Sequence, residues 1–459
     1  ASFSAWNNNT SSPKIKLWSL QPNTTYYYRV WSVDPTNSSN NASSQIYNFT
    51  TRECVSYKLV NATDTSITGI DHPIQEAIDM ICMSGGEVEL GSGVFDINET
   101  ILIGKSNFIL WGTHNTKVST DENIEIFIIP GGGYYGYDGN HVNITIRGFN
   151  MSKSAESYCT GRRGMIENYN ASNITIEDIW AEDTGFCHFY GTNSNQDTNL
   201  RSYYIWIRNN KVRGAITSML SQYVWFENNY VHDCGPPSFG IDANRNTADF
   251  IIRNNTVRNC GANAGIKIYT GSRLHVFNNI VLNVDQWGIE LLAGPRDSIV
   301  KNNTISGAGY GGILINPQFL SVNNTIINNV IYNNNGPGIL TTNFSHGFSG
   351  YNSSAIVKNN VIYNNTGDGI KFNSKYVNLT IKNNIIMEND GYGIDYMNTS
   401  NPTIIRYNNL FNNSFGPYNN TNCTTCISVD PLFADPANGD FHLKSQAGRW
   451  NGTDWVYDN

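Results

Sequence analysis

The chain has 459 residues, enough for a large core and more than one domain. Charged residues make up only 14% of it, against about 25% in an average globular protein, and the net charge is −8. The acidic balance and the lack of Lys/Arg runs argue against a nucleic-acid partner, and no apolar run approaches the roughly 18 residues of a membrane span.

Residues 1–51 contain runs typical of strands, from Leu20 to Val30 and from Tyr47 to Thr51. The first run resembles the second half of a fibronectin type III domain. Tyr26 stands where that family has a corner tyrosine, whose hydroxyl binds nearby backbone. Because such a sandwich needs about 100 residues, the resemblance implies a partial module, completed by a longer chain or by strands of a neighbouring molecule.

Residues 52–115 are predicted to form an N-terminal cap and the first coils of a solenoid. Apolar residues at 74, 77, 78 and 81 have helical spacing, which predicts a helix over 71–82 with Asp71 as its N-cap. The alternating residues 86–95 predict a strand. A solenoid's first coil exposes its core unless something covers it, so a helix is expected there.

Residues 116–427 repeat with a period of about 24 to 26 residues, which indicates a stacked architecture. Each repeat has two marked positions, an Asn-Asn doublet and a Gly-Ile pair. Short alternating strands with this period predict an all-β fold, a right-handed parallel β-helix with one coil per repeat. Leucine-rich repeats would need more Leu, and a propeller would need about 40 residues per unit. The doublets lie at 209–210, 228–229, 254–255, 278–279, 302–303, 328–329, 359–360, 383–384 and 408–409.

Alternation divides each doublet between the two sides of the wall. In Ile252–Val257 it places the second Asn, Asn255, inward at a bend and the first, Asn254, outward. Inward amides stacked about 4.8 Å apart can bind one another from coil to coil, which satisfies them in the core.

The tail, residues 428–459, resembles the closing segment of right-handed β-helix proteins of the pectate lyase-like and NosD-like kind. In such proteins the chain usually runs on beyond the stretch that matches Trp450–Asp458, so we expect this segment to be truncated. Together with the fibronectin-like start, the repeats resemble archaeal surface-layer or sheath glycoproteins.

Two features predict an extracellular location at the cell surface. Roughly two dozen Asn-x-Ser/Thr sequons occur, and the predicted carriers of covalent N-glycans include Asn23, Asn37, Asn48, Asn143, Asn173, Asn254, Asn302, Asn364 and Asn378. The even count of 8 cysteines predicts disulfides rather than a zinc site, because only one Cys-x-x-Cys exists. The economical pairing is Cys54–Cys82, Cys159–Cys187, Cys234–Cys260 and Cys423–Cys426.

The residue after each Gly-Ile pair should point outward, which stacks Asp242, Lys267 and Glu290 on successive rungs. Asp242 and Glu290 would lie about 9.6 Å apart, near the long end of the carboxyl spacing of an inverting glycosidase. Lys267 is the alternative candidate, as the base of a lyase, although two flanking carboxylates favour its charged form. The competing interpretation is a ladder of alternating charges that only stabilises the surface. Neighbouring outward positions predict a glycan-binding face that includes His188, Tyr190, Asn244 and Tyr269.

Other motifs are weaker evidence for a functional site. Arg162-Arg163 is a candidate contact for an acidic glycan, and His232-Asp233 is either a metal or proton pair or a turn hydrogen bond. Acidic residues are too scattered to assign a calcium site, so a structural calcium ion is left open and no other cofactor is predicted.

Two functions follow. The first is a structural glycoprotein that assembles with copies of itself into a surface layer, sheath or filament. The alternative is a β-helix polysaccharide lyase or glycoside hydrolase that acts on an acidic glycan. Fold alone does not decide between them.

Overall fold

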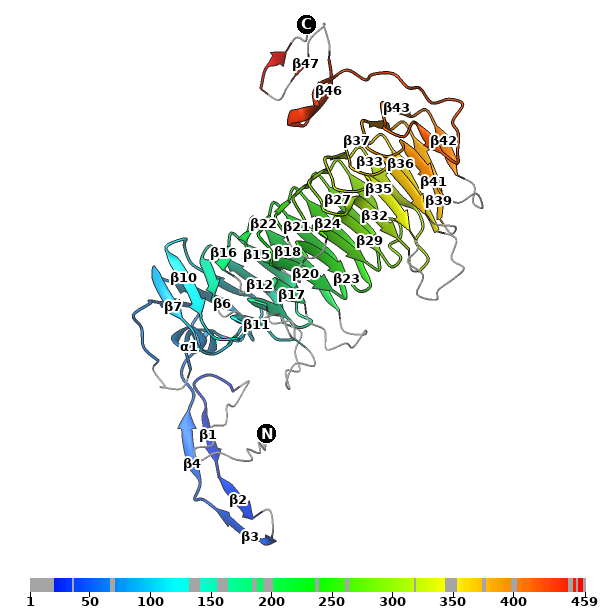
Figure 1. The fold of residues 1–459 in the computed structure, drawn as a ribbon. Helices are drawn as coiled ribbons and strands as arrows, with labels where there is room; N and C mark the ends of the chain where they lie inside the picture. The colour runs from blue at the N-terminus through cyan, green and yellow to red at the C-terminus, as the bar shows by residue number, and fades with distance from the viewer. Residues whose placement is uncertain are drawn as a thin grey trace.

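The computed structural model describes residues 20–34, 37–66, 71–131, 141–154, 164–183, 188–192, 201–235, 239–260, 264–317, 319–342, 353–373, 377–397, 403–444, 449–450 and 453–456. Most of these residues form one solenoid with three long parallel sheets (Figure 1). The predicted all-β parallel β-helix is therefore confirmed.

Each coil contributes one strand to each sheet. Sheet I contains β5 (Tyr57–Val60), β6 (Gly86–Leu90), β9 (Phe108–Trp111), β12 (Val142–Arg147), β15 (Ser172–Glu177), β18 (Ser202–Arg208), β21 (Ser221–Glu227), β24 (Thr247–Arg253), β27 (Gly271–Phe277), β30 (Ile299–Lys301), β33 (Asn324–Ile327), β36 (Ser353–Lys358), β39 (Val377–Lys382) and β42 (Ile404–Arg406). Sheet II contains β7 (Gly93–Asp96), β10 (Thr116–Thr120), β13 (Asn150–Lys153), β16 (Trp180–Asp183), β19 (Lys211–Val212), β22 (Tyr230–His232), β25 (Thr256–Arg258), β28 (Ile280–Leu282), β31 (Thr304–Ser306), β34 (Val330–Tyr332), β37 (Val361–Tyr363), β40 (Ile385–Met387) and β43 (Asn409–Phe411). Sheet III contains β8 (Ile101–Leu102), β11 (Phe127–Ile129), β14 (Ile166–Asn168), β17 (His188–Thr192), β20 (Ala215–Met219), β23 (Ile241–Asn244), β26 (Ile266–Tyr269), β29 (Trp287–Leu292), β32 (Gly311–Asn316), β35 (Ile339–Thr342), β38 (Ile370–Asn373), β41 (Ile394–Tyr396) and β44 (Tyr418–Asn419).

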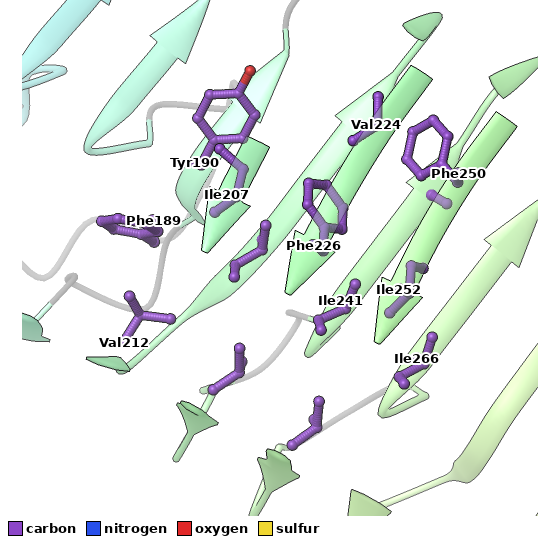
Figure 2. Packing of buried hydrophobic residues seen from close by; sticks show 14 of the residues in the cluster. Phe189, Tyr190, Ile207, Val212, Val224, Phe226, Ile241, Phe250, Ile252 and Ile266 are labelled. Atoms are coloured by element: carbon purple, nitrogen blue, oxygen red, sulfur yellow. The ribbon is translucent and has the colours of Figure 1, made fainter. Parts of the chain in front are cut away.

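The core runs along the inside of the coils. In β24, Phe250 and Ile252 alternate with outward residues and are fully buried. Figure 2 shows Phe250 beside Phe226 of the preceding coil, and the two rings pack edge to face. Burying each such side chain stabilises the fold by about 1.5–3 kcal/mol, so the repeated apolar positions hold the stack together.

The Asn-Asn doublets turn the chain from sheet I to sheet II. The second Asn of each of the first eight is buried, and each Nδ2 donates to Oδ1 of the next coil's Asn at 2.9–3.0 Å. The predicted internal amide ladder is thus confirmed. The first Asn has a left-handed backbone, as at Asn302 (φ 54°), a conformation that Asn tolerates better than most residues.

At the last doublet, Asn408-Asn409, the predicted ladder position was wrong by one residue. Asn408, not Asn409, is the buried ladder member, and Tyr407 takes the left-handed position (φ 58°). Cys426 closes this end of the ladder, because its Sγ accepts from the backbone N–H of Asn408 at 3.3 Å.

A second amide ladder, which the sequence analysis missed, lies at the turn from sheet II to sheet III. Asn334, Asn365, Asn389 and Asn413 stack there, with Nδ2 to Oδ1 distances of 2.8–2.9 Å.

The glycine of each Gly-Ile pair lies where adjacent coils approach most closely. A Cβ atom on Gly338 would lie 2.3 Å from Cγ2 of Ile362 and 2.7 Å from the carbonyl oxygen of Gly369. We expect Gly338→Ala to lower the free energy of unfolding by about 1–3 kcal/mol, because overpacking displaces backbone as well as side chain. Urea denaturation measures this change, and Ile362→Ala should relieve part of it. An unchanged midpoint in Gly338→Ala would show that the coils can separate at no cost.

Helix α1 (Pro73–Met80) lies at the N-terminal end of the solenoid (Figure 1). Its residues Ile74, Ala77 and Ile78 join the core, as their spacing predicts. The N-cap is His72 rather than Asp71, because Nδ1 of His72 accepts from the Ile74 N–H at 3.2 Å. The single strand expected over 86–95 is two strands, β6 and β7, separated by the corner between sheets I and II.

The N-terminal strands form two small antiparallel sheets outside the solenoid. They pair β1 (Thr25–Tyr28) with β4 (Tyr47–Thr50), and β2 (Trp31–Asp34) with β3 (Asn37–Ser43). The Tyr26 hydroxyl accepts from the Gln21 N–H at 2.8 Å, the local contact expected of a corner tyrosine. Two separate pairs of strands do not make a sandwich, so the fibronectin type III module stays a prediction.

The C-terminal segment turns back over the outside of sheet II. It contains β45 (Phe433–Asp435), η1 (Pro436–Asn438), β46 (Asp440–Leu443), β47 (Arg449–Trp450) and β48 (Trp455–Val456). The ring of Phe441 packs edge-on against Tyr332 and Tyr363, at 5.1 and 5.4 Å between centroids. The segment therefore covers part of the outer face of β34 and β37.

Three predicted disulfides are formed, namely Cys54–Cys82, Cys234–Cys260 and Cys423–Cys426. The fourth, Cys159–Cys187, lies outside the described residues. Such bonds persist in oxidising compartments, which favours a secreted protein. None of the helices in the described part of the chain is long and apolar enough to cross a membrane.

Candidate functional site

The outer face of sheet III carries the predicted ladder of charged residues. Asp242 is in register with Lys267, and Lys267 with Glu290, on successive strands β23, β26 and β29. The same register then continues through Leu314, Leu340, Lys371 and Asp395, as the Gly-Ile repeat predicts. The flanking residues Ile241 and Ala243 belong to the core, so the ladder positions face outward.

The two carboxylates of the site are withdrawn from solvent although they face outward. Asp242 is 2% exposed, and its Oδ2 accepts from Nδ2 of Asn244 at 2.8 Å. Burial raises the pKa of Glu290 above its ordinary value. The nearby charge of Asp242 acts in the same direction, and that of Lys267 opposes it. A carboxyl group with a raised pKa can carry a proton at a pH where an ordinary glutamate has lost it.

The ammonium group of Lys267 lies over two aromatic rings. Its Nζ is 3.9 Å from the ring centroid of Phe239 and 5.4 Å from that of Tyr269, so both rings contact the ammonium group through their π faces. The aliphatic stem of Lys267 still starts on the rung between the two carboxylates.

An apolar cluster borders the charged residues on the same outer face. Ala264, Trp287 and Leu314 are buried in it, with Phe239 and Leu340 packed against them. This cluster is separate from the core of the solenoid. Charged groups beside aromatic rings suit a sugar, which offers hydroxyl groups at its edges and C–H groups on its faces.

The other predicted glycan-binding residues have mixed outcomes. Asn244 and Tyr269 lie beside the charged residues, through Asp242 and Lys267 respectively. His188 lies next to Thr217, with 3.3 Å between Nδ1 and Oγ1, and Thr217 is in register with Asp242.

The prediction that Tyr190 faces outward was wrong. Its side chain is fully buried in the core (Figure 2), and its hydroxyl accepts from Nδ2 of Asn168 at 3.1 Å. The register shifts between His188 and Tyr190 where β17 pairs with β20, which moves Tyr190 to the inside. A spacing rule carried over from later coils cannot detect such a shift.

Further along the ladder, the charged residues form a closed set of ion pairs. Nζ of Lys371 lies 3.0 Å from Asp368 and 3.3 Å from Asp395. Although burial acts in the opposite direction, the contacts with these carboxylates raise the pKa of Lys371. The Tyr392 N–H and Nδ2 of Asn419 donate to the same two carboxylates, at 2.7 and 2.9 Å. This part of the ladder fits the stabilising role that the sequence analysis weighed.

Phe239 and Trp287 were not predicted as site residues. Each stands directly before the glycine of a Gly-Ile pair, and an aromatic residue at that position was the available signal.

The His232-Asp233 pair lies away from this face, on the side of sheet II. Nδ1 of His232 lies 2.8 Å from Oδ2 of Asp233, and its Nε2 lies 3.6 Å from Oε2 of Glu182. His232 belongs to β22 and Glu182 to β16, both in sheet II. Hydrogen bonding to His232 is the main cause that lowers the pKa of Asp233. Arg162-Arg163 lies outside the described residues.

Comparison with known families matches two parts of the chain. Residues 205–352 match the family described as periplasmic copper-binding protein (NosD), and residues 367–459 match the family described as disaggregatase related. Each match covers less than half of the chain. No curated protein is similar enough to count as a relative.

The copper named in the first family's description has no candidate site among the described residues. Within the described residues, no group of three or more His, Cys, Asp or Glu side chains is placed to hold a metal ion. The two cysteines of the matched stretch, Cys234 and Cys260, are bonded to each other and so cannot act as thiolate ligands.

Solved structures with the same fold include carbohydrate-active proteins. A GH87 alpha-1,3-glucanase catalytic domain, solved as an aspartate variant with tetrasaccharides, is 17% identical. The match covers 82% of this chain and 68% of that one, with a TM-score of 0.54. The Azotobacter vinelandii mannuronan C-5 epimerase AlgE6 A-module is 14% identical, with coverage of 78% and 94% and a TM-score of 0.47. At 17% identity the similarity to the glucanase domain shows the right-handed type of parallel β-helix and no activity.

Proposed function

We propose that this chain binds a polysaccharide along the outer face of sheet III and hydrolyses it there. Glu290 would protonate the glycosidic oxygen as the C–O bond breaks, and Asp242 would take a proton from the attacking water. The observation that carries the proposal is the pair itself. Two carboxyl groups stand two rungs apart on one face, and burial raises the pKa of one of them, Glu290.

The spacing favours hydrolysis with inversion. Two rungs correspond to about 9.6 Å between backbones, which leaves room for a water molecule between the carboxyl groups and the sugar. The lyase alternative needs the Lys267 amine to reach the sugar as a base, whereas its Nζ lies over the rings of Phe239 and Tyr269.

The substrate is proposed only as a polysaccharide. Lys267 is flanked by two carboxylates, so the local charge gives no preference for the acidic glycan of the sequence-based hypothesis. The aromatic and apolar border formed by Phe239, Trp287 and Tyr269 supports contact with sugar faces of either kind.

The test is a screen of the purified protein against neutral glucans and uronic-acid polymers. New reducing ends without ultraviolet absorbance support hydrolysis, and absorbance from an unsaturated uronate supports the lyase alternative. If no polymer in a broad panel is cleaved, the proposal loses its basis.

A second candidate is the structural surface protein that assembles with copies of itself. The exposed aromatic side chains of the N-terminal strands favour it, since Tyr27 and Trp31 are 71% and 61% exposed. Electron micrographs of material from the native source test this role. Only isolated monomers in them would contradict it.

Glycosylation is a separate prediction about location. Most of the predicted carriers with described side chains are exposed (Asn23, Asn48, Asn143, Asn173, Asn254, Asn302 and Asn364), whereas Asn378 is half-buried. We expect a glycopeptide map of native material to show Asn254 and Asn302 modified. If both were bare, the argument for a cell-surface location would be weakened.

A further inference from the structure

Two lysines at equivalent ladder positions behave differently. Lys371 lies beside Asp395 in the register of sheet III and forms ion pairs with it and with Asp368. Lys267 lies between two carboxylates in the same register, yet its ammonium group is over the ring of Phe239. The two rungs differ in two ways: Lys371 has Asp368 three residues before it where Lys267 has Ala264, and Lys267 has the ring of Phe239 beside it.

Phe239 is held in place by the apolar cluster of the outer face. It packs against Ala264, Trp287 and Leu314 directly before the Gly240–Ile241 turn into β23. A ring fixed in this way offers Lys267 a cation–π contact comparable in strength to an exposed ion pair. The contact is therefore strong enough to decide where the ammonium group lies.

We propose that Phe239 is a positioning residue of the proposed hydrolase, which keeps the Lys267 ammonium group over its ring and out of an ion pair with Glu290, so that Glu290 keeps the proton it donates. The catalytic role of Phe239 rests on the proposed function, whereas its effect on the position of the Lys267 ammonium group does not. The groups that face Glu290 are Lys267 from β26, Asp242 from β23 and the apolar Leu314 from β32.

Removing the ring should release the lysine. In Phe239→Leu, which keeps an apolar side chain in the cluster, the ammonium group is free to approach the carboxylate of Glu290. An opposite charge within about 4–6 Å favours the ionised form of a carboxyl group. We therefore expect the titration midpoint of Glu290 to fall by about one pH unit. Phe239→Tyr keeps the ring and should leave the midpoint unchanged.

The measurement is a ¹³C NMR titration of protein labelled at the glutamate carboxyl carbons, with the Glu290 signal assigned by its loss in Glu290→Gln. A fall in Phe239→Leu and none in Phe239→Tyr supports the inference. An equal midpoint in Phe239→Leu and the wild type overturns it. Because the titration needs no substrate, its result tests the role of Phe239 independently of whether the protein cleaves a polysaccharide. Where cleavage is found, the cleavage rate of Phe239→Leu should begin to fall at a pH about one unit lower than that of the wild type.

A second measurement uses the wild type alone and guards against a variant that does not fold. Protons near an aromatic face resonate upfield, so the ε-methylene signal of Lys267 should lie upfield of the other lysines, with assignment by Lys267→Arg. A Lys267 signal at the ordinary position overturns the inference.

Discussion

Glu290→Gln and Asp242→Asn are each expected to lower kcat for polysaccharide cleavage by about 10²–10⁴-fold. Glutamine cannot donate the proton that the leaving oxygen needs, and asparagine cannot accept one from water. Both substitutions conserve shape, so substrate binding and the thermal midpoint should change little. The measurement is the rate of reducing-end release under saturating substrate.

Asp395→Asn is the matched control, because Asp395 occupies the same outward ladder but belongs to the closed ion-pair set with Lys371. It should leave kcat within about twofold of the wild type, since the residue contacts no reacting group. If Asp395→Asn lowers kcat as far as Glu290→Gln does, the loss reflects damage to the sheet and not a catalytic role.

The pH dependence has a definite sign. A general acid works only while protonated, so cleavage should fall as pH rises through the pKa of Glu290. Because that pKa is raised, the fall in cleavage rate should lie at a higher pH than for an ordinary glutamate.

The product should first appear with inverted anomeric configuration, which proton NMR follows directly.

The second large effect concerns the amide ladder. Asn303 is 1% exposed and accepts at Oδ1 from both the backbone N–H and Nδ2 of Asn279, at 3.0 and 2.9 Å. Its own Nδ2 donates to Val276 O and Asn329 Oδ1. Asn303→Ala leaves several buried groups without partners, each at a cost of about 1–3 kcal/mol. We expect the free energy of unfolding to fall by roughly 3 kcal/mol or more, measured by urea denaturation.

Its neighbour provides the control. Asn302 is exposed and has a left-handed backbone that glycine also accepts, so Asn302→Gly should change stability by only a few tenths of a kcal/mol. Comparable losses at both positions would mean that the doublet acts through composition and not through the buried ladder.

The repeat made the fold predictable from sequence because it samples one local geometry many times. The eight regular doublets and the Gly-Ile register were predicted correctly, since both follow from period-two alternation in coils of nearly equal length. The same rule failed where a coil departs from the pattern. At Tyr190 a register shift carries the side chain inside, and at Asn408 the doublet moves by one residue.

The site was only partly predictable. Asp242, Lys267 and Glu290 were found because their register follows from the backbone repeat. The position of the Lys267 ammonium group was not predicted. It depends on Phe239, which is distant in sequence and reaches Lys267 only through tertiary packing. The burial of Asp242 and the raised pKa of Glu290 likewise depend on neighbours that no spacing rule contains.

The most direct test of the account is a crystal structure of Glu290→Gln with an oligosaccharide of the cleaved polymer. We predict a chain lying along the outer face of sheet III, with its scissile oxygen near residue 290, a water molecule beside Asp242 and a sugar face against Phe239 or Trp287. Sugar bound elsewhere would contradict the account, for example on the stacked Trp206 and Trp225 of sheet I, whose rings lie 4.7 Å apart.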